Sequence, residues 1–379
     1  MEEQLLGRPA QDLLTPADRA AFRGQRLLVT GAGGSVGSEL ARQLAASRPA
    51  RLTLVDHSEY ALFTVERELR ARYEGLEIEA LLCDVTRRVD MRAACRRARP
   101  HAIYHAAAYK HVPIAEASIV PAVRVNVLGA VEAAVAARES GGRFVLVSSD
   151  KAAQPRSVMG ATKRLAEMAV LAMVSATFRP LAVRFGNILG SSGSLVEIMA
   201  RSVREGRNIP LTHPDATRFF MTAAEAASLV LKADLIGGRG TVYWLDMGEP
   251  LRIGDLVERF LACAAAAGHP RVGTDVIGLR AGEKMREELT IQGLAMRSTA
   301  HRKIWAARQP TVDQERLARA LRALRRAVAA GDAARALLAL ESAIDGYSPS
   351  AAAWAAARET DVRARNQGQT RVAGSRATA

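Results

Sequence analysis

The sequence predicts an α/β protein whose core is a doubly wound parallel sheet, accompanied by a smaller C-terminal subdomain. Short apolar runs alternate with segments of helical period, as strands and helices do in such sheets. A glycine-rich turn joins the first apolar run to the first helical segment. Between and after the last apolar runs, polar glycine-rich loops break the alternation, which indicates the second, smaller part.

The composition is typical of a globular protein in a reducing compartment. Hydrophobic residues make up 49% of the 379 residues, and the three cysteines are too scattered for a disulfide framework or a zinc site, so we expect no metal. Apolar runs such as 168–174 are shorter than the about 20 residues that a membrane helix needs. The N-terminus lacks the layout of a signal peptide. We therefore expect a soluble, cytoplasmic protein.

The formal net charge of +14 suits an anionic partner. Nucleic acid is the weaker interpretation, because aromatic residues are only 4% and do not interleave with the basic ones. An anionic substrate explains the charge as well, and so does attraction to an acidic membrane surface. We expect no nucleic-acid partner and consider peripheral membrane association through the basic C-terminal tail.

The first strand, residues 26–30, runs directly into the sequence GAGGSVG, and a helical pattern follows. Glycines at this spacing between a strand and a helix are typical of a dinucleotide site. They permit a tight turn and a close approach of a pyrophosphate, and the helix N-terminus favours an anion. The candidate cofactor-binding residues of this turn are Gly31, Gly33, Gly34, Ser35, Val36 and Gly37.

The next two strands end near acidic residues. The second, 52–55, ends at Asp56, at roughly the ~20-residue offset where an acidic side chain contacts the adenosine ribose. Its carboxylate would repel a 2′-phosphate, which favours NAD over NADP, although His57 and Ser58 could soften that preference. The third strand, 78–82, leads to Asp84 and Val85. Asp84 either holds the adenine amino group or caps the following helix.

The fourth strand, 102–105, is followed by small residues that let a flat or charged ligand pass closely. Lys110 could meet a phosphate or a sugar hydroxyl there. Asn126 begins the next helix, either as a cofactor contact or simply as an N-cap. The cofactor candidates of this region are Ala106, Ala107, Ala108, Lys110 and Asn126.

The fifth strand carries the stretch around which we expect the chemistry to be organised. It ends at Ser149, Asp150 and Lys151, on the edge where open parallel sheets bind ligands. A helix resumes around Met159, and Lys163 lies one turn later on the same face. A hydroxyl, a carboxylate and two amines that converge on one spot supply an acid, a base and hydrogen-bond donors.

Strands over 144–147, 181–185 and 242–245 complete the sheet. The irregular segments between and after them carry polar residues that suit a diphosphate, because planar guanidinium groups match paired oxygens. Each arginine has the alternative of an ordinary surface position on a loop. The candidate substrate-binding residues are Lys110, Asn187, Thr212, Arg218, Arg280 and Glu283.

These motifs resemble the extended short-chain dehydrogenase/reductase superfamily that acts on nucleotide sugars. The resemblance is closest to the polysaccharide-biosynthesis (CapD-like) UDP-N-acetylglucosamine 4,6-dehydratases, and it covers roughly residues 5–295. The lead-in LLGRPAQDL looks like the linker that follows the membrane segments of longer members. The matching phrases, in the family's order, are TGAGGSVGSEL, LVDHSEY, HAAAYKHVP, SSDKAAQPRSVMGATKR, VRFGNILGSSGS, THPDATRFFMT, LDMGEP and GLRAGEK.

The resemblance implies a reaction in which NAD⁺ takes a hydride from C4 of the sugar and the hydride later returns to C6. Lys151 resembles the base that removes the C5 proton, and Asp150 the acid that protonates the departing C6 hydroxyl. Ser149 would hydrogen-bond the C4 oxygen, and Lys163 would hold the nicotinamide ribose. An Asp–Lys pair suits this work only if burial raises one pKa and lowers the other, while their mutual attraction opposes both shifts.

The chain departs from the family pattern at Met159, where most of the superfamily has the Tyr of Tyr-x-x-x-Lys. A thioether cannot take the C4 hydroxyl proton, so Ser149, a water or Lys163 must relay it. The Met variant resembles the C5-retaining branch of the dehydratases. Ser149 replaces a usual Thr and keeps its hydroxyl, and Ala281 replaces a common Pro.

The resemblance and the patterns together predict four parts and, from the family, a homo-oligomer. Residues 1–24 are a lead-in. Residues 25–188 with 222–247 form an NAD-binding Rossmann-type domain, and 189–221 with 248–308 a subdomain that binds the UDP-sugar. Residues 309–379 have helical leucine spacing and end in a basic tail that we expect to be disordered.

Two other functions compete with the dehydratase. A UDP-sugar 4-epimerase uses the Tyr that is missing here and does not need the Asp150–Lys151 pair. A non-catalytic NAD-binding sensor is the second alternative, since a fold alone does not establish a function. A sensor would need neither the acid–base pair nor the arginine loops.

Overall fold

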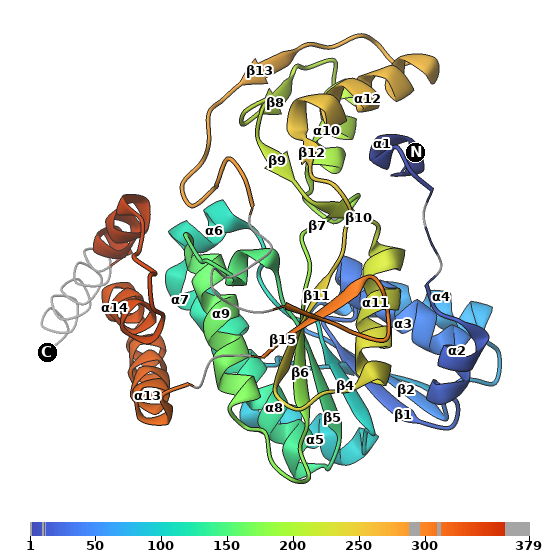
Figure 1. Ribbon diagram of the computed structural model, residues 1–379, viewed down its shortest axis with the longest axis vertical. Coiled ribbons are helices and arrows are strands. Elements are labelled where there is room, and N and C mark those ends of the chain that lie inside the picture. The colour runs from blue at the N-terminus through green and yellow to red at the C-terminus, as the bar shows by residue number, and fades with distance from the viewer. Residues whose placement is uncertain (1, 10, 12, 288–295, 309–311, 361–379) are drawn as a thin grey trace, which may run out of the picture.

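The structure, a computed structural model, describes residues 2–9, 11, 13–287, 296–308 and 312–360 (Figure 1). The predicted disordered tail, 361–379, lies outside the described residues. The described chain forms a large central sheet between helices, a smaller subdomain above it in Figure 1, and C-terminal helices at one side.

The central sheet has nine strands in the order β14-β15-β11-β6-β5-β4-β1-β2-β3. All neighbours from β3 to β11 run parallel, and the order 3-2-1-4-5-6 is that of a Rossmann-type doubly wound sheet. This confirms the predicted fold class. The strands are β1 (Arg26–Thr30), β2 (Arg51–Asp56), β3 (Ile78–Leu82), β4 (Ala102–His105), β5 (Arg143–Val147), β6 (Pro180–Arg184), β11 (Thr241–Leu245), β14 (Met296–Ser298) and β15 (Ile304–Arg308).

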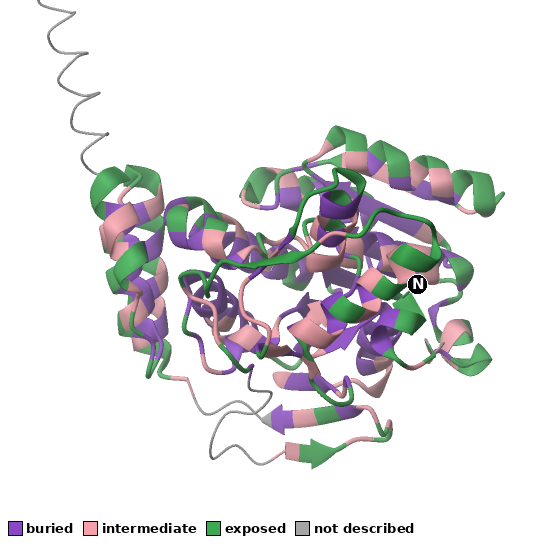
Figure 2. Ribbon diagram, turned by 90° about the horizontal axis from the view of Figure 1, so that it is seen from above, coloured by how far each residue is buried: buried purple, intermediate pink, exposed green. Residues whose placement is uncertain are grey.

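Helices cover both faces of the sheet, so its central strands are buried almost throughout (Figure 2). On one face, α3, α4 and α11 share a core cluster with the strands, together with the lead-in residues Leu14 and Phe22. On the other face, α5, α8 and α9 do so. The helices are α2 (Pro16–Phe22), α3 (Ser35–Ala46), α4 (Glu59–Arg72), α5 (Arg88–Ala98), α6 (Val112–Ala117), α7 (Ile119–Val123), α8 (Ala130–Glu139), α9 (Val158–Leu171) and α11 (Ala223–Ile236).

The smaller subdomain has its own core, and the first helix of the chain belongs to it. Leu5 and Leu6 of α1 are buried against α12, so this part of the lead-in packs as a component of the subdomain. Its elements are α1 (Glu2–Leu6), α10 (Leu195–Arg204), α12 (Ile253–Ala266) and three two-stranded sheets: β7 (Asn187–Ile188) with β10 (Phe220–Met221), β8 (Ile209–Leu211) with β13 (Thr274–Val276), and β9 (Thr217–Arg218) with β12 (Leu251–Arg252).

The β14–β15 hairpin differs from the predicted division of the chain. It lies within the range 248–308 that we expected in the subdomain, yet β15 pairs antiparallel with β11 and extends the central sheet. Ile304 and Ala307 are buried in the two core clusters of that sheet. The pairing covers the backbone edge of β11, which would otherwise be open.

The region from α7 to α8 is one helix, Ile119–Glu139, with a π-helical segment at Arg124–Gly129. An 18-residue window of this 21-residue helix has a mean hydropathy of 1.6, so by length and composition the helix could cross a membrane. However, 78% of its apolar window is buried inside the protein, as in a core helix. The expectation concerned uninterrupted apolar runs, which Arg124 and Glu132 break in this helix, and the helix packs in the core.

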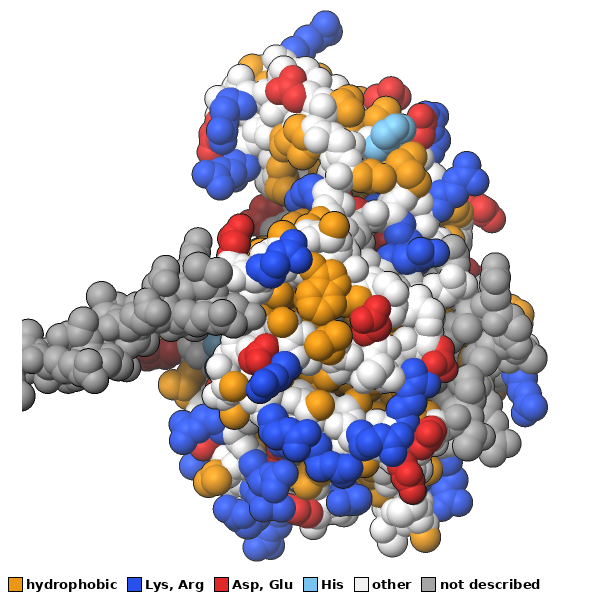
Figure 3. Space-filling view, turned by 90° about the vertical axis from the view of Figure 1, so that its left-hand side faces the viewer, with side chains coloured by type: hydrophobic (Ala, Val, Ile, Leu, Met, Phe, Trp, Pro, Cys, Tyr) orange, Lys and Arg blue, Asp and Glu red, His pale blue; other side chains and the backbone are white. Residues whose placement is uncertain are grey.

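The predicted leucine spacing after residue 309 corresponds to α13 (Gln314–Ala330), which α14 (Ala333–Ala343) and the helical residues 351–360 follow. Leu317 and Leu324 of α13 pack in one cluster with α7, α9 and α14. On the side of the molecule that carries these helices, Lys and Arg side chains gather over the lower half, mixed with Asp and Glu (Figure 3). Much of the basic excess is thus on an exposed surface.

Candidate cofactor and substrate site

The glycine-rich turn lies between β1 and α3, as predicted. Gly31 has a φ of +67°, and a Cβ there would lie 2.6 Å from the backbone N of Ala107. A Cβ on Gly37 would lie 1.9 Å from the carbonyl oxygen of Gly31. The turn therefore packs directly against the helix and against the segment after β4. The helix begins at Ser35 with Gly34 as N-cap, so no side chain caps it and its first N–H groups can receive an anion.

Asp56 lies at the end of β2 and reaches back to the glycine turn. Its Oδ2 accepts a hydrogen bond from the Gly33 N–H at 2.9 Å, and its Oδ1 accepts one from the Ser58 N–H at 2.9 Å. A carboxylate can accept further hydrogen bonds, so ribose hydroxyls can still bind it. His57 is exposed beside it, with Nδ1 at 3.4 Å from Asp56 Oδ1, and Ser58 caps α4.

Asp84 does not cap the following helix. Its Oδ1 accepts a hydrogen bond from the Thr86 N–H at 2.9 Å, while α5 begins only at Arg88 with Arg87 as N-cap. The N-cap alternative was therefore wrong. The exposed Asp84 stays a candidate for the adenine amino group, and Val85 next to it is buried against the α7–α8 helix near Gly129.

Asn126 lies inside the long α7–α8 helix and not at a helix start, so its predicted N-cap alternative was also wrong. Its Oδ1 accepts from the Tyr109 N–H at 2.7 Å, and its Nδ2 donates to the Tyr109 carbonyl at 3.0 Å and to Thr162 Oγ1 at 3.0 Å. Because the oxygen and the nitrogen of its amide group are both hydrogen-bonded, Asn126 holds the loop that follows Ala106, Ala107 and Ala108 in place. Lys110 on this loop donates to Ser191 Oγ at 3.0 Å, and burial lowers its pKa.

The predicted catalytic residues meet at the end of β5. Asp150 is buried, and its Oδ1 accepts from Ser149 Oγ at 2.8 Å, from the Lys151 N–H at 2.8 Å and from Lys151 Nζ at 3.1 Å. Its Oδ2 is buried without a hydrogen-bond partner among the described residues. An unpaired buried carboxylate oxygen is costly, and such groups mark functional sites.

Lys151 is surrounded by oxygen atoms. Besides Asp150, its Nζ lies 3.2 Å from Asn187 Oδ1 and 3.2 Å from Glu287 Oε1, and only 19% of its side chain is exposed. Burial lowers the pKa of Lys151, but the attraction of Asp150 and Glu287 outweighs it, so the pKa is raised overall. The lowered lysine pKa that the base role requires is therefore not a property of this state.

Met159 and Lys163 share the buried face of α9, as predicted from their spacing. Lys163 Nζ donates to the Val147 carbonyl of β5 at 2.7 Å. Burial lowers the pKa of Lys163 to about 8, and Glu167 only partly offsets this. Met159 is also buried, so the position that carries a Tyr in most of the superfamily holds no titratable group.

The predicted substrate residues fall into two groups. Asn187 and Arg218 lie near the catalytic pair: Asn187 contacts Lys151, and Arg218 is buried with Nε at 3.8 Å from Glu287. Arg280 is exposed and bound to Glu283 through its backbone N–H at 2.9 Å and its guanidinium at 2.6 Å. Thr212, just after β8, is partly buried, and within the described part of the chain no side-chain hydrogen bond joins it to the catalytic pair.

Two features of the site were not predicted from the sequence. Glu287 follows GLRAGEK by three residues, and nothing local indicates that it would reach Lys151. The second is a buried network in which Glu167 Oε1 accepts from Ser148 Oγ at 2.6 Å and from Arg184 Nε at 2.7 Å. Arg184 stacks on Trp244 at 4.7 Å, so the network ties α9 to β5, β6 and β11. A buried arginine inside an apolar strand was its only sequence signal.

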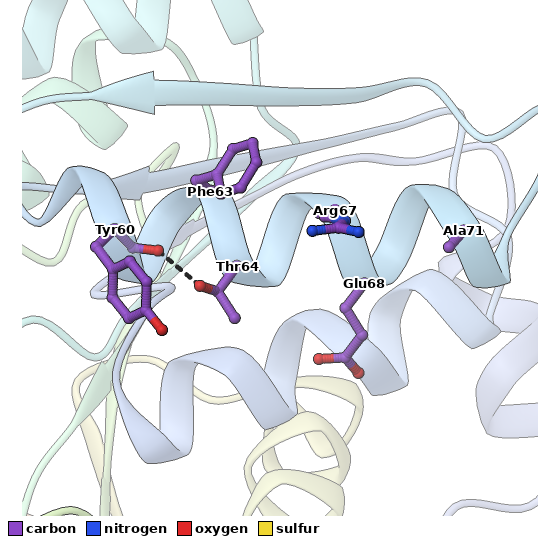
Figure 4. A pocket seen from close by; sticks show the side chains of 6 residues that line it. All are labelled: Tyr60, Phe63, Thr64, Arg67, Glu68 and Ala71. Carbon is purple, nitrogen blue, oxygen red and sulfur yellow. Dashed lines mark hydrogen bonds between the residues drawn. The ribbon is translucent and has the colours of Figure 1, made fainter.

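A separate pocket lies along α4 (Figure 4). All of its lining side chains come from this one helix, and Thr64 Oγ1 in it donates to the Tyr60 carbonyl at 2.8 Å. None of the catalytic candidates lines it, so it is not the site of the chemistry. The lining residues are Tyr60, Phe63, Thr64, Arg67, Glu68 and Ala71.

Comparison with known proteins agrees with this geometry. A probable polysaccharide biosynthesis protein EpsC of Bacillus subtilis is 42% identical over 291 residues, which are 76% of this chain and 48% of the relative, so the chain spans about half of that protein. A UDP-N-acetylglucosamine 4,6-dehydratase (inverting) of Campylobacter jejuni is 28% identical over 70% of this chain and 77% of its own. Pen from Bacillus thuringiensis has a similar structure, with a TM-score of 0.71 and 26% identity over 76% of this chain and 89% of that one. The family model described as "Polysaccharide biosynthesis protein" matches residues 27–309, and the chain therefore belongs to this family.

Proposed function

We propose that this chain is an NAD-dependent 4,6-dehydratase that converts UDP-N-acetylglucosamine to the UDP-4-keto-6-deoxy sugar with retention at C5, for surface polysaccharide or glycan biosynthesis. The observation that carries the proposal is the buried Asp150–Lys151 pair at the end of β5, in which one carboxylate oxygen has no partner among the described residues. The Campylobacter relative is named as such a dehydratase, which supports the reaction class. That relative is described as inverting, so retention rests on Met159 alone.

The residues present fit a nicotinamide dinucleotide. Gly31 and Gly37 let the turn lie close to the α3 N-terminus, whose first N–H groups no side chain caps. The Asp56 carboxylate suits ribose hydroxyls and disfavours a 2′-phosphate, so we propose NAD over NADP. A bound nicotinamide supplies the acceptor for the C4 hydride. Lys163 is the residue that we propose holds the nicotinamide ribose.

The pair of Asp150 and Lys151 can supply both the acid and the base through one proton. In this state Lys151 is charged and Asp150 accepts its hydrogen bond at 3.1 Å. Transfer of that proton to Asp150 produces a neutral amine and a protonated carboxyl group together. The amine can then take the C5 proton, and the carboxyl group can protonate the departing C6 hydroxyl. Exclusion of water by bound substrate favours this neutral form, because desolvation penalises both charges.

The competing functions fit the site less well. An epimerase relies on a Tyr at the position of the buried Met159, which holds no proton. A non-catalytic sensor has no use for a buried carboxylate with an unpaired oxygen beside a lysine. A cytoplasmic location, a homo-oligomer, the lack of a nucleic-acid partner and membrane association through the basic tail stay predictions.

The proposal is tested by incubating the purified protein with UDP-N-acetylglucosamine and following the sugar by proton NMR. We expect a new C6 methyl signal and loss of the C4 proton signal without net consumption of NAD. Asp150→Asn should reduce this conversion strongly. Interconversion with the C4 epimer would instead support the epimerase. No change in any UDP-sugar despite bound NAD would support the sensor.

A further inference from the structure

Residues 278–287, which we call the strap, connect the two halves of the site. Gly282 has a φ of +77°, and a Cβ there would lie 2.8 Å from Ser157 Cβ, so the strap packs on the loop before α9. Lys284 Nζ fixes it there by donating to the Gln154 carbonyl at 2.9 Å. On the other side, the Thr217 N–H of β9 donates to the Met285 carbonyl at 2.9 Å. The strap is therefore anchored to both the central domain and the subdomain.

This anchoring places Glu287 between two cations that come from different parts of the chain. Its Oε1 lies 3.2 Å from Lys151 Nζ of the central domain and 3.8 Å from Arg218 Nε of the subdomain. The Glu287 side chain is only 3% exposed, so solvent does not weaken these interactions much. A buried carboxylate is stable only with such partners, and here both of them are residues of the proposed site.

We propose that Glu287 is a positioning residue of this site, whose carboxylate holds the Lys151 amino group in place and links it to Arg218. Its catalytic meaning rests on the proposed dehydratase function. Among the described residues, the groups that face Lys151 are Asp150 and Glu287, which are acidic, Arg218, which is basic, and the neutral Asn187. Removing the charge of Glu287 therefore leaves Lys151 with one carboxylate and one nearby cation.

If Glu287 has this role, removing its charge changes the pH at which Lys151 loses its proton. Two carboxylates near one ammonium favour its charged form, whereas Arg218 disfavours it. Glu287→Gln keeps the size of the side chain and removes its charge. Lys151 should then lose its proton at lower pH than in the unchanged protein. A residue that merely filled space would not alter this titration.

The first test measures that titration directly and does not depend on turnover. The chain has six lysines, so labelling lysine with ¹³C at Cε gives few NMR signals. The signal that is missing from the spectrum of Lys151→Arg is that of Lys151. We expect the Lys151 signal to titrate at lower pH in Glu287→Gln. Glu205→Gln, which removes an exposed carboxylate of the same subdomain, is the control and should cause no shift. An unchanged Lys151 titration in folded Glu287→Gln would overturn the proposal.

A second variant allows the test to be made even if Glu287→Gln does not fold. Glu287→Asp keeps the charge but shortens the side chain, so Lys151 should titrate between the unchanged protein and Glu287→Gln. If Glu287→Gln does not fold, the shift in Glu287→Asp decides the question, and no shift there overturns the proposal. Thermal unfolding of each variant establishes which case applies.

Turnover of UDP-N-acetylglucosamine separates this inference from the proposed function. Because the Asp150–Lys151 pair works with one shared proton, loss of the Lys151 proton to solvent removes the acid, so we expect the alkaline limb of the kcat/KM profile to move to lower pH in Glu287→Gln. Looser positioning should reduce kcat by up to about 100-fold. If the unchanged protein shows no turnover while the NMR shift occurs, the function fails and the positioning role stands. Turnover with the same pH profile and kcat in both proteins overturns the positioning role alone.

Discussion

The proposed catalytic residues illustrate what can be predicted residue by residue. Ser149, Asp150 and Lys151 were found because they directly follow an apolar strand, and the ends of parallel strands lie at one edge of the sheet. Glu287 could not be found in this way, because its approach to Lys151 depends on how the strap packs between two domains. The raised pKa of Lys151 follows from that same packing. From the sequence we could say that burial and the attraction of Asp150 shift this pKa in opposite directions, but not which of the two is larger.

Lys163 should make the stability of the protein depend on pH in the alkaline range. Its charged form is disfavoured in the folded state, where its pKa is about 8 against an ordinary value of 10.5. Between these two values the unfolded chain binds more protons than the folded one, so the free energy of unfolding rises with pH. In Lys163→Met this rise should be smaller. Urea unfolding across that range measures it, and an identical rise in the variant would contradict the account.

At the scale of elements, the strands and the glycine turn were predictable, whereas two other features were not. Each parallel strand is a short apolar run bounded by turn signals, which is a local pattern. The β14–β15 hairpin joins the sheet through pairing with β11, and no local signal indicates that partner. Asn126 looked like an N-cap because the sequence did not show that α7 and α8 form one continuous helix.

The contact between the glycine turn and α3 gives a prediction at this scale. In Gly37→Ala the new methyl group would lie 1.9 Å from the Gly31 carbonyl oxygen, so the helix and turn must move apart. We expect NAD affinity to fall at least about tenfold, because the backbone N–H groups leave their places around the pyrophosphate. Calorimetric titration with NAD measures this change.

Gly206→Ala is the control for that variant. Unlike Gly37, Gly206 has a positive φ, of +63°, and no described atom lies within 4 Å of an added Cβ. It should lose some stability through backbone strain and keep its affinity for NAD. Equal NAD affinities of Gly37→Ala and the unchanged protein would show that the turn is not the cofactor site.

At the scale of the whole molecule, the C-terminal helices belong to the fold that holds the site. The cluster of α13 and α14 includes Val158, Met159 and Leu165 of α9, the helix that carries Lys163. Ser350 also donates to Glu116 at 2.5 Å, and Glu116 accepts from the Val158 N–H at the start of α9 at 2.6 Å. The sequence predicted a helix here but not its partner, because helical spacing does not say which surface a helix covers.

Two adjacent leucines of α14 test this packing. Leu337 is fully buried, whereas Leu338 is 54% exposed. Leu337→Ala should lower the free energy of unfolding by about 2–5 kcal/mol, as for other buried leucines, within one cooperative transition. Leu338→Ala should have an effect of less than about 0.5 kcal/mol. Equal effects, or a separate early transition, would indicate that these helices do not share the core of α9.

The central claim is that the Asp150–Lys151 pair removes the C5 proton of a UDP-sugar. The most direct measurement is NMR of UDP-N-acetylglucosamine incubated with the protein in deuterated water, in parallel with Lys151→Ala. We expect a 4-keto-6-deoxy product with deuterium at C5 and coupling constants of the retained configuration. In Lys151→Ala we expect a rate at least about 100-fold lower with NAD still bound. Undiminished formation of the deuterated product by Lys151→Ala would contradict the account.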